Sequence, residues 1–124
     1  MKKDSYLKLG DLKVYKMALS LSEVGWQIYQ GLHQQDKYLF GSQFIRCIDS
    51  IGANIAEGYG RYHYKDRAKF YYNARGSLVE AKHWTFLLYK RKKIVIKTLN
   101  NLLHKLEETH KTLNSYIKSC YKNI

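Results

Sequence analysis

The chain has 124 residues, 45% of them hydrophobic, and its 22 Lys and Arg against 10 Asp and Glu give a net charge of +12. This length suits a single domain, residues 1–124, and no run approaches the ~18 apolar residues of a membrane span. The charged first residues have no apolar stretch behind them, so we expect no secretory signal. The two cysteines, Cys47 and Cys120, follow no metal or redox spacing, which favours a cytoplasmic protein with reduced thiols.

The first predicted helix covers residues 12–32. Gly10 and Asp11 offer an N-cap before it, and Gly31 stands where it should end. Proline is absent from the whole chain, so long uninterrupted helices are permitted. Apolar or small residues recur at alternating steps of four and three, the spacing of one buried helix face: Val14, Ala18, Leu21, Gly25, Ile28 and Leu32.

The second predicted helix covers residues 38–57, with Asp36 as a possible cap. Its buried face is expected to hold Phe44, Ile48, Ile51 and Ile55. The two glycines of Gly58-Tyr59-Gly60 then interrupt the pattern, which predicts a turn.

The third predicted helix, residues 64–89, has apolar residues on two faces. One face holds Phe70, Ala74, Ser77, Ala81, Trp84 and Leu88, and the opposite face holds Ala68, Tyr72, Arg75, Val79, Lys82 and Phe86. A helix that is apolar on both sides is usually covered on both, and in a chain this short the second cover would come from another subunit. We therefore predict a homo-oligomer with Tyr72, Val79 and Phe86 in the interface. The alternative is a single large core within one chain, with two isolated aromatic residues outside it.

The fourth predicted helix covers residues 98–121, with Thr98 as its N-cap. Its apolar face should hold Val95, Leu99, Leu102, Leu106, Thr109, Leu113, Tyr116 and Cys120. Four helices joined by short turns pack as antiparallel neighbours. The sequence therefore predicts an all-α, up-down-up-down four-helix bundle.

The positive charge is concentrated in one segment. Residues 61–97 hold 11 basic and 2 acidic side chains, which is +9 of the +12, and such clustering is typical of a surface that binds a polyanion. Arg61, Lys65 and Lys69 follow one another at steps of four, as one stripe of a helix would. The predicted nucleic-acid-binding residues are Arg61, Lys65, Arg67, Lys69, Arg75, Lys82, Lys90, Arg91, Lys92 and Lys93. The last four suit either a second binding patch or a solvated helix end.

Tyrosines are interleaved with these cations, at Tyr59, Tyr62, Tyr64, Tyr71 and Tyr72. Aromatic faces stack on unpaired bases, while cations neutralise phosphates and release counterions. The alternative is that the tyrosines pack at helix and subunit contacts, with basic side-chain stems lying over them. Both interpretations fit the spacing.

A group of polar residues near the second turn has two interpretations, an active site or a structural network. The group consists of Asn54, Glu57, Arg61, Arg75 and Glu80. We favour a network that sets the angle of the second helical hairpin, since opposite charges near a turn satisfy one another.

Gly76 inside a helix costs about 1 kcal/mol relative to alanine, and we expect Ile55 or Ala56 to approach it closely.

No motif predicts catalysis, a metal or a cofactor. The five histidines form no His-x-x-x-His pair, and no carboxylate cluster is visible. Gly58-Tyr59-Gly60 lacks the preceding strand and the lysine of a phosphate loop. A non-enzymatic protein without cofactors is therefore expected.

Two stretches resemble a known family. They are Ser-Ile-Gly-Ala-Asn-Ile-Ala-Glu-Gly-Tyr-Gly-Arg at residues 50–61, and Ala-Arg-Gly-Ser-Leu-Val-Glu at residues 74–80. In combination they look like the four-helix bundle family of intervening-sequence proteins, whose members are encoded in insertions of bacterial large-subunit ribosomal RNA genes and also as stand-alone genes. The chain departs from the family where proline is often found, holding Gly52 and His33-Gln34-Gln35 there.

That family is similar in fold to the accessory variability protein of diversity-generating retroelements, a barrel-shaped homopentamer whose basic surface binds nucleic acid and a reverse transcriptase. The resemblance implies a bundle that forms pentamers and contacts RNA or DNA. We therefore predict a non-catalytic bundle that binds structured nucleic acid mainly through phosphates. The alternative is an adaptor whose basic face docks an acidic protein, such as a polymerase or reverse transcriptase.

Overall fold

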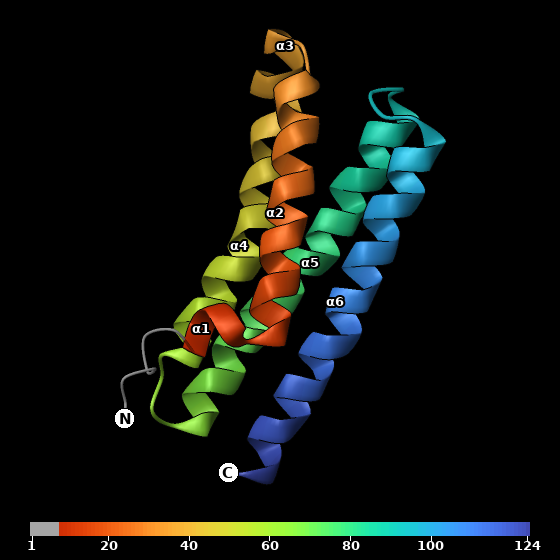
Figure 1. Cartoon of the computed structure of the whole chain (residues 1–124). Coiled ribbons are helices and arrows are strands. Elements are labelled where there is room, and N and C mark those ends of the chain that lie inside the picture. Colours follow the sequence, from red (N-terminus) through yellow and green to blue (C-terminus); the bar gives the residue numbers. More distant parts are fainter. Residues whose placement is uncertain (1–7) are drawn as a thin grey trace.

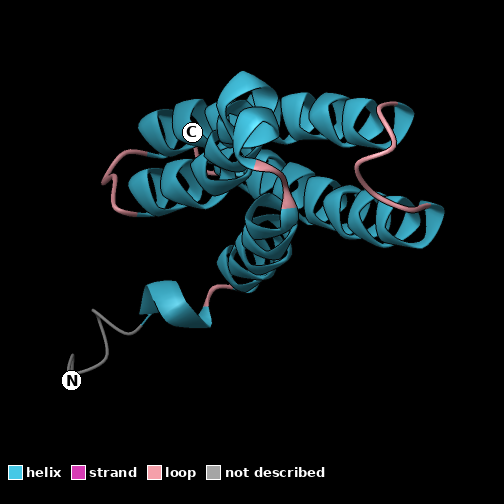
Figure 2. Ribbon diagram, turned by 90° about the horizontal axis from the view of Figure 1, so that it is seen from above, coloured by secondary structure: helices cyan, strands magenta, loops and turns pink. Residues whose placement is uncertain are grey.

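The computed structural model describes residues 8–124, and every regular element in that range is a helix (Figure 2). The four long helices are α2 (Lys13–Gly31), α4 (Ser42–Tyr59), α5 (Tyr64–Lys90) and α6 (Ile96–Lys122). Each packs against the next along the chain, and α6 also packs against α2. The helices alternate in direction (Figure 1), so the predicted all-α antiparallel bundle is confirmed. The expectation about a secretory signal concerns residues 1–7, which lie outside the described residues.

Three short elements lie ahead of the first two long helices, one before α2 and two between α2 and α4. The helix α1 (Lys8–Asp11) comes before α2, and α3 (Gln34–Asp36) leads through a π-helical turn, η1 (Lys37–Gly41), into α4. Gly10 and Asp11 therefore lie within α1, and the N-cap of α2 is Leu12, whose side chain makes no capping hydrogen bond. No proline separates α3 from α4, so the second helical run begins earlier than predicted, at Gln34.

The predicted apolar faces of α2 and α4 form one half of the core. Val14, Ala18 and Leu21 of α2 are fully buried, as is the predicted face of α4, which consists of Phe44, Ile48, Ile51 and Ile55. Gly25 is buried as well, and a Cβ there would lie 3.2 Å from Cγ2 of Ile48. This small residue lets α2 and α4 approach closely.

The buried face of α5 is centred between the two predicted faces. It holds Ala68, Tyr71, Ala74, Leu78, Ala81, Thr85 and Leu88, whereas Phe70, Ser77 and Trp84 are only half-buried at one edge. The shift follows from the position of α5, which packs against both α4 and α6. The Thr85 hydroxyl is satisfied inside the core because it donates to the Ala81 carbonyl oxygen at 2.7 Å.

The turn between α5 and α6 closes with a backbone motif. The Lys93 amide donates to the Leu88 carbonyl at 2.8 Å, and the Lys92 amide to the Tyr89 carbonyl at 2.9 Å, with Lys92 in the left-handed region at φ 61°. Helix α6 then starts at Ile96, two residues before the predicted cap. The N-cap, Val95, is 66% exposed, so its prediction as a buried residue is wrong. None of the helices within residues 8–124 is long and apolar enough to cross a membrane.

Candidate nucleic-acid interface

The turn between α4 and α5 is built around Gly58. A Cβ at this position would lie 2.8 Å from Cε1 of the buried Tyr71 ring and 3.1 Å from the Arg67 carbonyl oxygen. Only glycine allows the end of α4 to lie so close to the first turns of α5. The chain then leaves α4 at Gly60 and enters α5 at Tyr64.

Two arginines hold this turn in shape. Arg61 Nη2 donates to Glu57 Oε2 at 2.6 Å, and its guanidinium lies over the Phe70 ring, 4.7 Å from the centroid. Arg67 Nε donates to the Arg61 carbonyl oxygen at 2.7 Å, and its guanidinium lies 5.0 Å from the centroid of Tyr64. Arg61 lies before α5 begins, so it does not belong to a helical stripe with Lys65 and Lys69. It is paired with Glu57, and both side chains of this pair remain about half exposed.

Lys65 and Lys69 are the available cations of this end. Both are exposed on the outer side of α5, one turn apart, and neither forms an ion pair with a described residue. Arg67 is half-buried and uses only Nε for the backbone bond, which leaves its two terminal nitrogens as donors. Asp66, in the first turn of α5, is the nearby carboxylate.

The five interleaved tyrosines have different environments. Tyr71 is 3% exposed, and burial, the main cause, raises the pKa of its phenol to about 12. Tyr72 meets Tyr121 of α6 edge-on at 6.3 Å between centroids, and Tyr59 is partly buried. Tyr62, 87% exposed, and Tyr64 stand beside the available cations.

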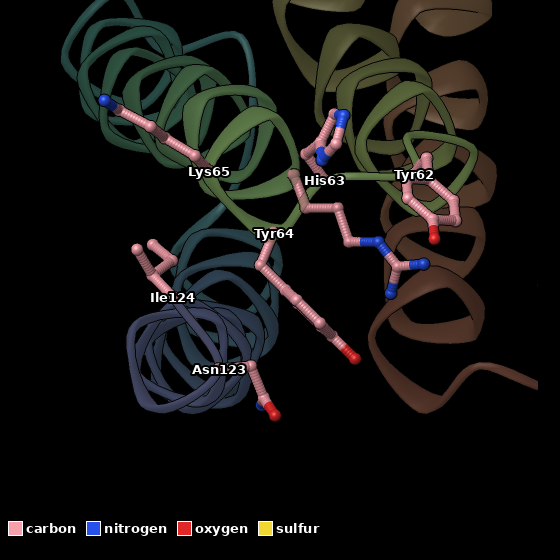
Figure 3. Close-up of a pocket in the computed structure, with 7 residues that line it drawn as sticks. Tyr62, His63, Tyr64, Lys65, Asn123 and Ile124 are labelled. Atoms are coloured by element: carbon pink, nitrogen blue, oxygen red, sulfur yellow. The ribbon is translucent and has the colours of Figure 1, made fainter.

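Tyr62 and Tyr64 line a cavity of about 490 Å³ at this end of the bundle, together with His63, Lys65, Arg67, Asn123 and Ile124. In Figure 3, Tyr64 lies above Asn123, between Lys65 on one side and Tyr62 on the other. We call residues 61–69 with Asn123 and Ile124 the α4–α5 end. It combines exposed aromatic rings, cations and a hollow surface.

Arg75 and Lys82, also predicted to bind nucleic acid, contact α6. Arg75 Nη1 donates to Asn114 Oδ1 at 2.9 Å. Lys82 Nζ lies 2.7 Å from Glu107 Oε1 and 3.0 Å from His110 Nδ1. The hydrogen bond and charge of Lys82 lower the pKa of Glu107, while burial and then the same charge lower the pKa of His110. Both cations thus join α5 to α6, away from the α4–α5 end.

The cluster Lys90–Lys93 lies at the other end of α5, whose 27 residues make a helix about 40 Å long. Lys93 Nζ pairs with Asp36 Oδ2 at 2.8 Å, and the Arg91 guanidinium lies 5.0 Å from the centroid of Phe40. Lys90 and Lys92 are exposed. Half of this cluster therefore fastens the α5–α6 turn to the α3–η1 segment, and the ten predicted cations do not share one surface.

The predicted polar network does not form as a unit. Only Glu57 and Arg61 contact each other, whereas the Asn54 amide donates to the Ser50 carbonyl at 2.9 Å and Glu80 accepts from the Trp84 indole at 3.1 Å. Arg75 cannot join Glu80, because side chains five residues apart on a helix point about 140° apart.

Gly76 lies in open space. A Cβ there would have no neighbour within 4 Å, so the expected approach of Ile55 or Ala56 is wrong. The glycine that makes a close contact at this hairpin is Gly58.

Both cysteines are free and buried. Cys47 Sγ donates to the Ser77 carbonyl at 2.9 Å, and burial followed by the charge of Glu80 raises the pKa of this thiol to about 12. Burial also raises the pKa of Cys120. Such thiols stay protonated and unreactive.

Across residues 8–124, no three His, Cys, Asp or Glu side chains gather as metal ligands.

Sequence reasoning missed Asn123 and Ile124 as neighbours of the basic turn. The signal was present, because the periodic face of α6 continues to Cys120 and an antiparallel partner must end where α5 begins. The Lys82–Glu107–His110 contact was also missed, since it depends on the register between two helices.

A model of the 23S rRNA-intervening sequence protein family matches residues 10–115. Among solved structures, the chain is similar to a protein of unknown function from the S23 ribosomal protein family of Bacteroides thetaiotaomicron, with a TM-score of 0.80 and 25% identity. The match covers 85% of this chain and 98% of that chain. No curated protein matches.

Proposed function

The chain belongs to the 23S rRNA-intervening sequence protein family, and from this premise we propose that it is a non-catalytic protein that binds structured RNA or DNA through phosphate contacts. The observation that carries the proposal is the α4–α5 end, where Lys65 and Lys69 are exposed and unpaired among the described residues, beside Arg67. The net charge of +12 attracts a polyanion over a longer range.

Phosphate contacts make a quantitative prediction about salt. If Lys65, Lys69 and Arg67 each neutralise one phosphate, the logarithm of the association constant falls linearly with the logarithm of salt concentration, with a slope of about −3. Fluorescence anisotropy of a labelled RNA hairpin, titrated at several salt concentrations, measures this slope. An affinity that does not change with salt, or no binding at low salt, contradicts the proposal.

The alternative partner is an acidic protein, which the same cations would recognise through carboxylates. A pull-down from lysate treated with nuclease distinguishes the two. A partner retained after nuclease treatment favours the adaptor role, for example on a polymerase. The free, buried thiols support the cytoplasmic setting that both roles share.

We also propose that the protein is a homo-oligomer. Tyr72, Val79 and Phe86 are 37%, 51% and 50% exposed and follow at steps of seven along the outer side of α5, so they form one apolar ridge. Gly76 lies between them with open space above it. A second copy lying over this ridge would bury its apolar surface and account for the glycine. The family resemblance suggests a pentamer.

Removal of the apolar ridge should dissociate the oligomer. We expect light scattering of the purified protein to give a mass several times that of one chain, and Val79→Glu with Phe86→Glu to give the mass of one chain, because buried carboxylates would face apolar surface. Tyr38→Glu with Leu39→Glu, at two residues that are 83% and 60% exposed, is the matched control and should leave the mass unchanged. A wild-type protein with the mass of one chain contradicts the proposal.

A further inference from the structure

The α4–α5 end holds two aromatic rings that lie outside the core. Tyr62 is 87% exposed and Tyr64 39% exposed. The Tyr62 ring lies perpendicular to that of His63, at 5.0 Å between centroids and 85° between planes. Tyr64 has the Arg67 guanidinium 5.0 Å from its centroid. Neither ring takes part in the core, in contrast to Tyr71 nearby.

The cavity between these rings and the end of α6 has a suitable size for one small ligand. Its volume is about 490 Å³, within the range of about 300–1,000 Å³ that is usual for small-molecule sites. Its lining includes aromatic rings, cations and the amide side chain of Asn123. Aromatic planes suit a base, cations suit a phosphate, and an amide offers both a donor and an acceptor to a base edge.

A duplex would not use these features. Its bases are stacked on one another and present only their edges, so a tyrosine ring meets a base face only where the nucleotide is unpaired. Contacts to the phosphates of a duplex need exposed cations but no cavity. Rings, cavity and cations at one place therefore favour a nucleotide that has left the helix.

Resting on the proposed function, we propose that the α4–α5 end binds an unpaired nucleotide of a structured nucleic acid, in a loop or a bulge. Its base stacks on Tyr62 or Tyr64, and its phosphate contacts Lys65 or Arg67. The adjoining duplex contacts Lys69 through its phosphates.

The test compares two RNAs with the same stem, one closed by an unpaired loop and one a blunt duplex. Anisotropy titrations use the wild type, Tyr62→Ala with Tyr64→Ala, and Tyr62→Phe with Tyr64→Phe. We expect the wild type to bind the looped RNA roughly tenfold more tightly than the duplex, because base stacking on an aromatic ring contributes about this much to affinity. The alanine variant should lose this preference while keeping duplex affinity, and the phenylalanine variant should retain it.

The outcomes separate the two proposals. If the wild type binds both RNAs equally in a salt-dependent manner, or the alanine variant keeps the preference, the unpaired-nucleotide site is refuted and the proposed function stands. If neither RNA binds, the proposed function fails as well. Thermal unfolding confirms that the exposed-site variants are folded.

Discussion

Lys65→Glu combined with Lys69→Glu should weaken the binding of an RNA hairpin about 100-fold at about 0.1 M salt, because each lost phosphate contact removes nearly one decade of affinity from counterion release. Both side chains are exposed, so the core does not change. Arg61 is left intact because its pair with Glu57 holds the turn. The same anisotropy titration measures the loss, and the salt slope should fall by about 2.

The matched control is Lys90→Glu with Lys92→Glu. It makes the same change in net charge at the opposite end of α5, at two exposed residues that lie beyond a Debye length of about 10 Å from the α4–α5 end. We expect this variant to lose at most a few-fold in affinity. An equal loss in both variants would show that binding follows the total charge and not the α4–α5 end.

The second large effect concerns stability, and it comes from Gly58→Ala. The added methyl group would lie 2.8 Å from Cε1 and 3.0 Å from Cδ1 of Tyr71, and 3.1 Å from the Arg67 carbonyl oxygen. The ring is buried and the carbonyl belongs to a helix, so neither can move freely. Overpacking of this kind lowers the free energy of unfolding by about 1–3 kcal/mol. Urea unfolding followed by circular dichroism measures the loss.

Gly31→Ala is the control for this experiment. A Cβ at Gly31 has no neighbour within 4 Å, and no described glycine has a positive φ. The free energy of unfolding should therefore stay within about 0.5 kcal/mol of the wild type. If Gly58→Ala were as well tolerated as Gly31→Ala, the close approach of α4 to Tyr71 would not exist in solution.

The free energy of unfolding should also depend on pH, because the pKa values of two groups at the α5–α6 contact are shifted in the folded chain. The pKa values of Glu107 and His110 are lower in the folded chain than their ordinary values, so the unfolded chain binds more protons at acidic pH. The stabilisation that these two groups contribute to the free energy of unfolding is therefore fully present above the ordinary pKa of histidine, about 6.5. It is lost as the pH falls through the pKa of His110 in the folded chain and then through the pKa of Glu107.

The sequence alone determined the helical architecture. Apolar residues at steps of four and three placed Val14, Ala18 and Leu21 on one face and Ile48 and Ile51 on another, and all five are fully buried. The pair of glycines after Glu57 located the turn to within a residue or two. This succeeds because the helical period is local, and the choice of buried face follows from residues on the same helix.

Only the tertiary structure decided which cations are available. Lys65 and Lys69 extend from the bundle, while Lys82 meets Glu107 and Lys93 meets Asp36 across 25 or more positions of sequence. Such partners depend on the rotation and register of one helix against the next. Those are set by how whole faces interlock, as at Gly58, and the spacing within a single helix does not contain them.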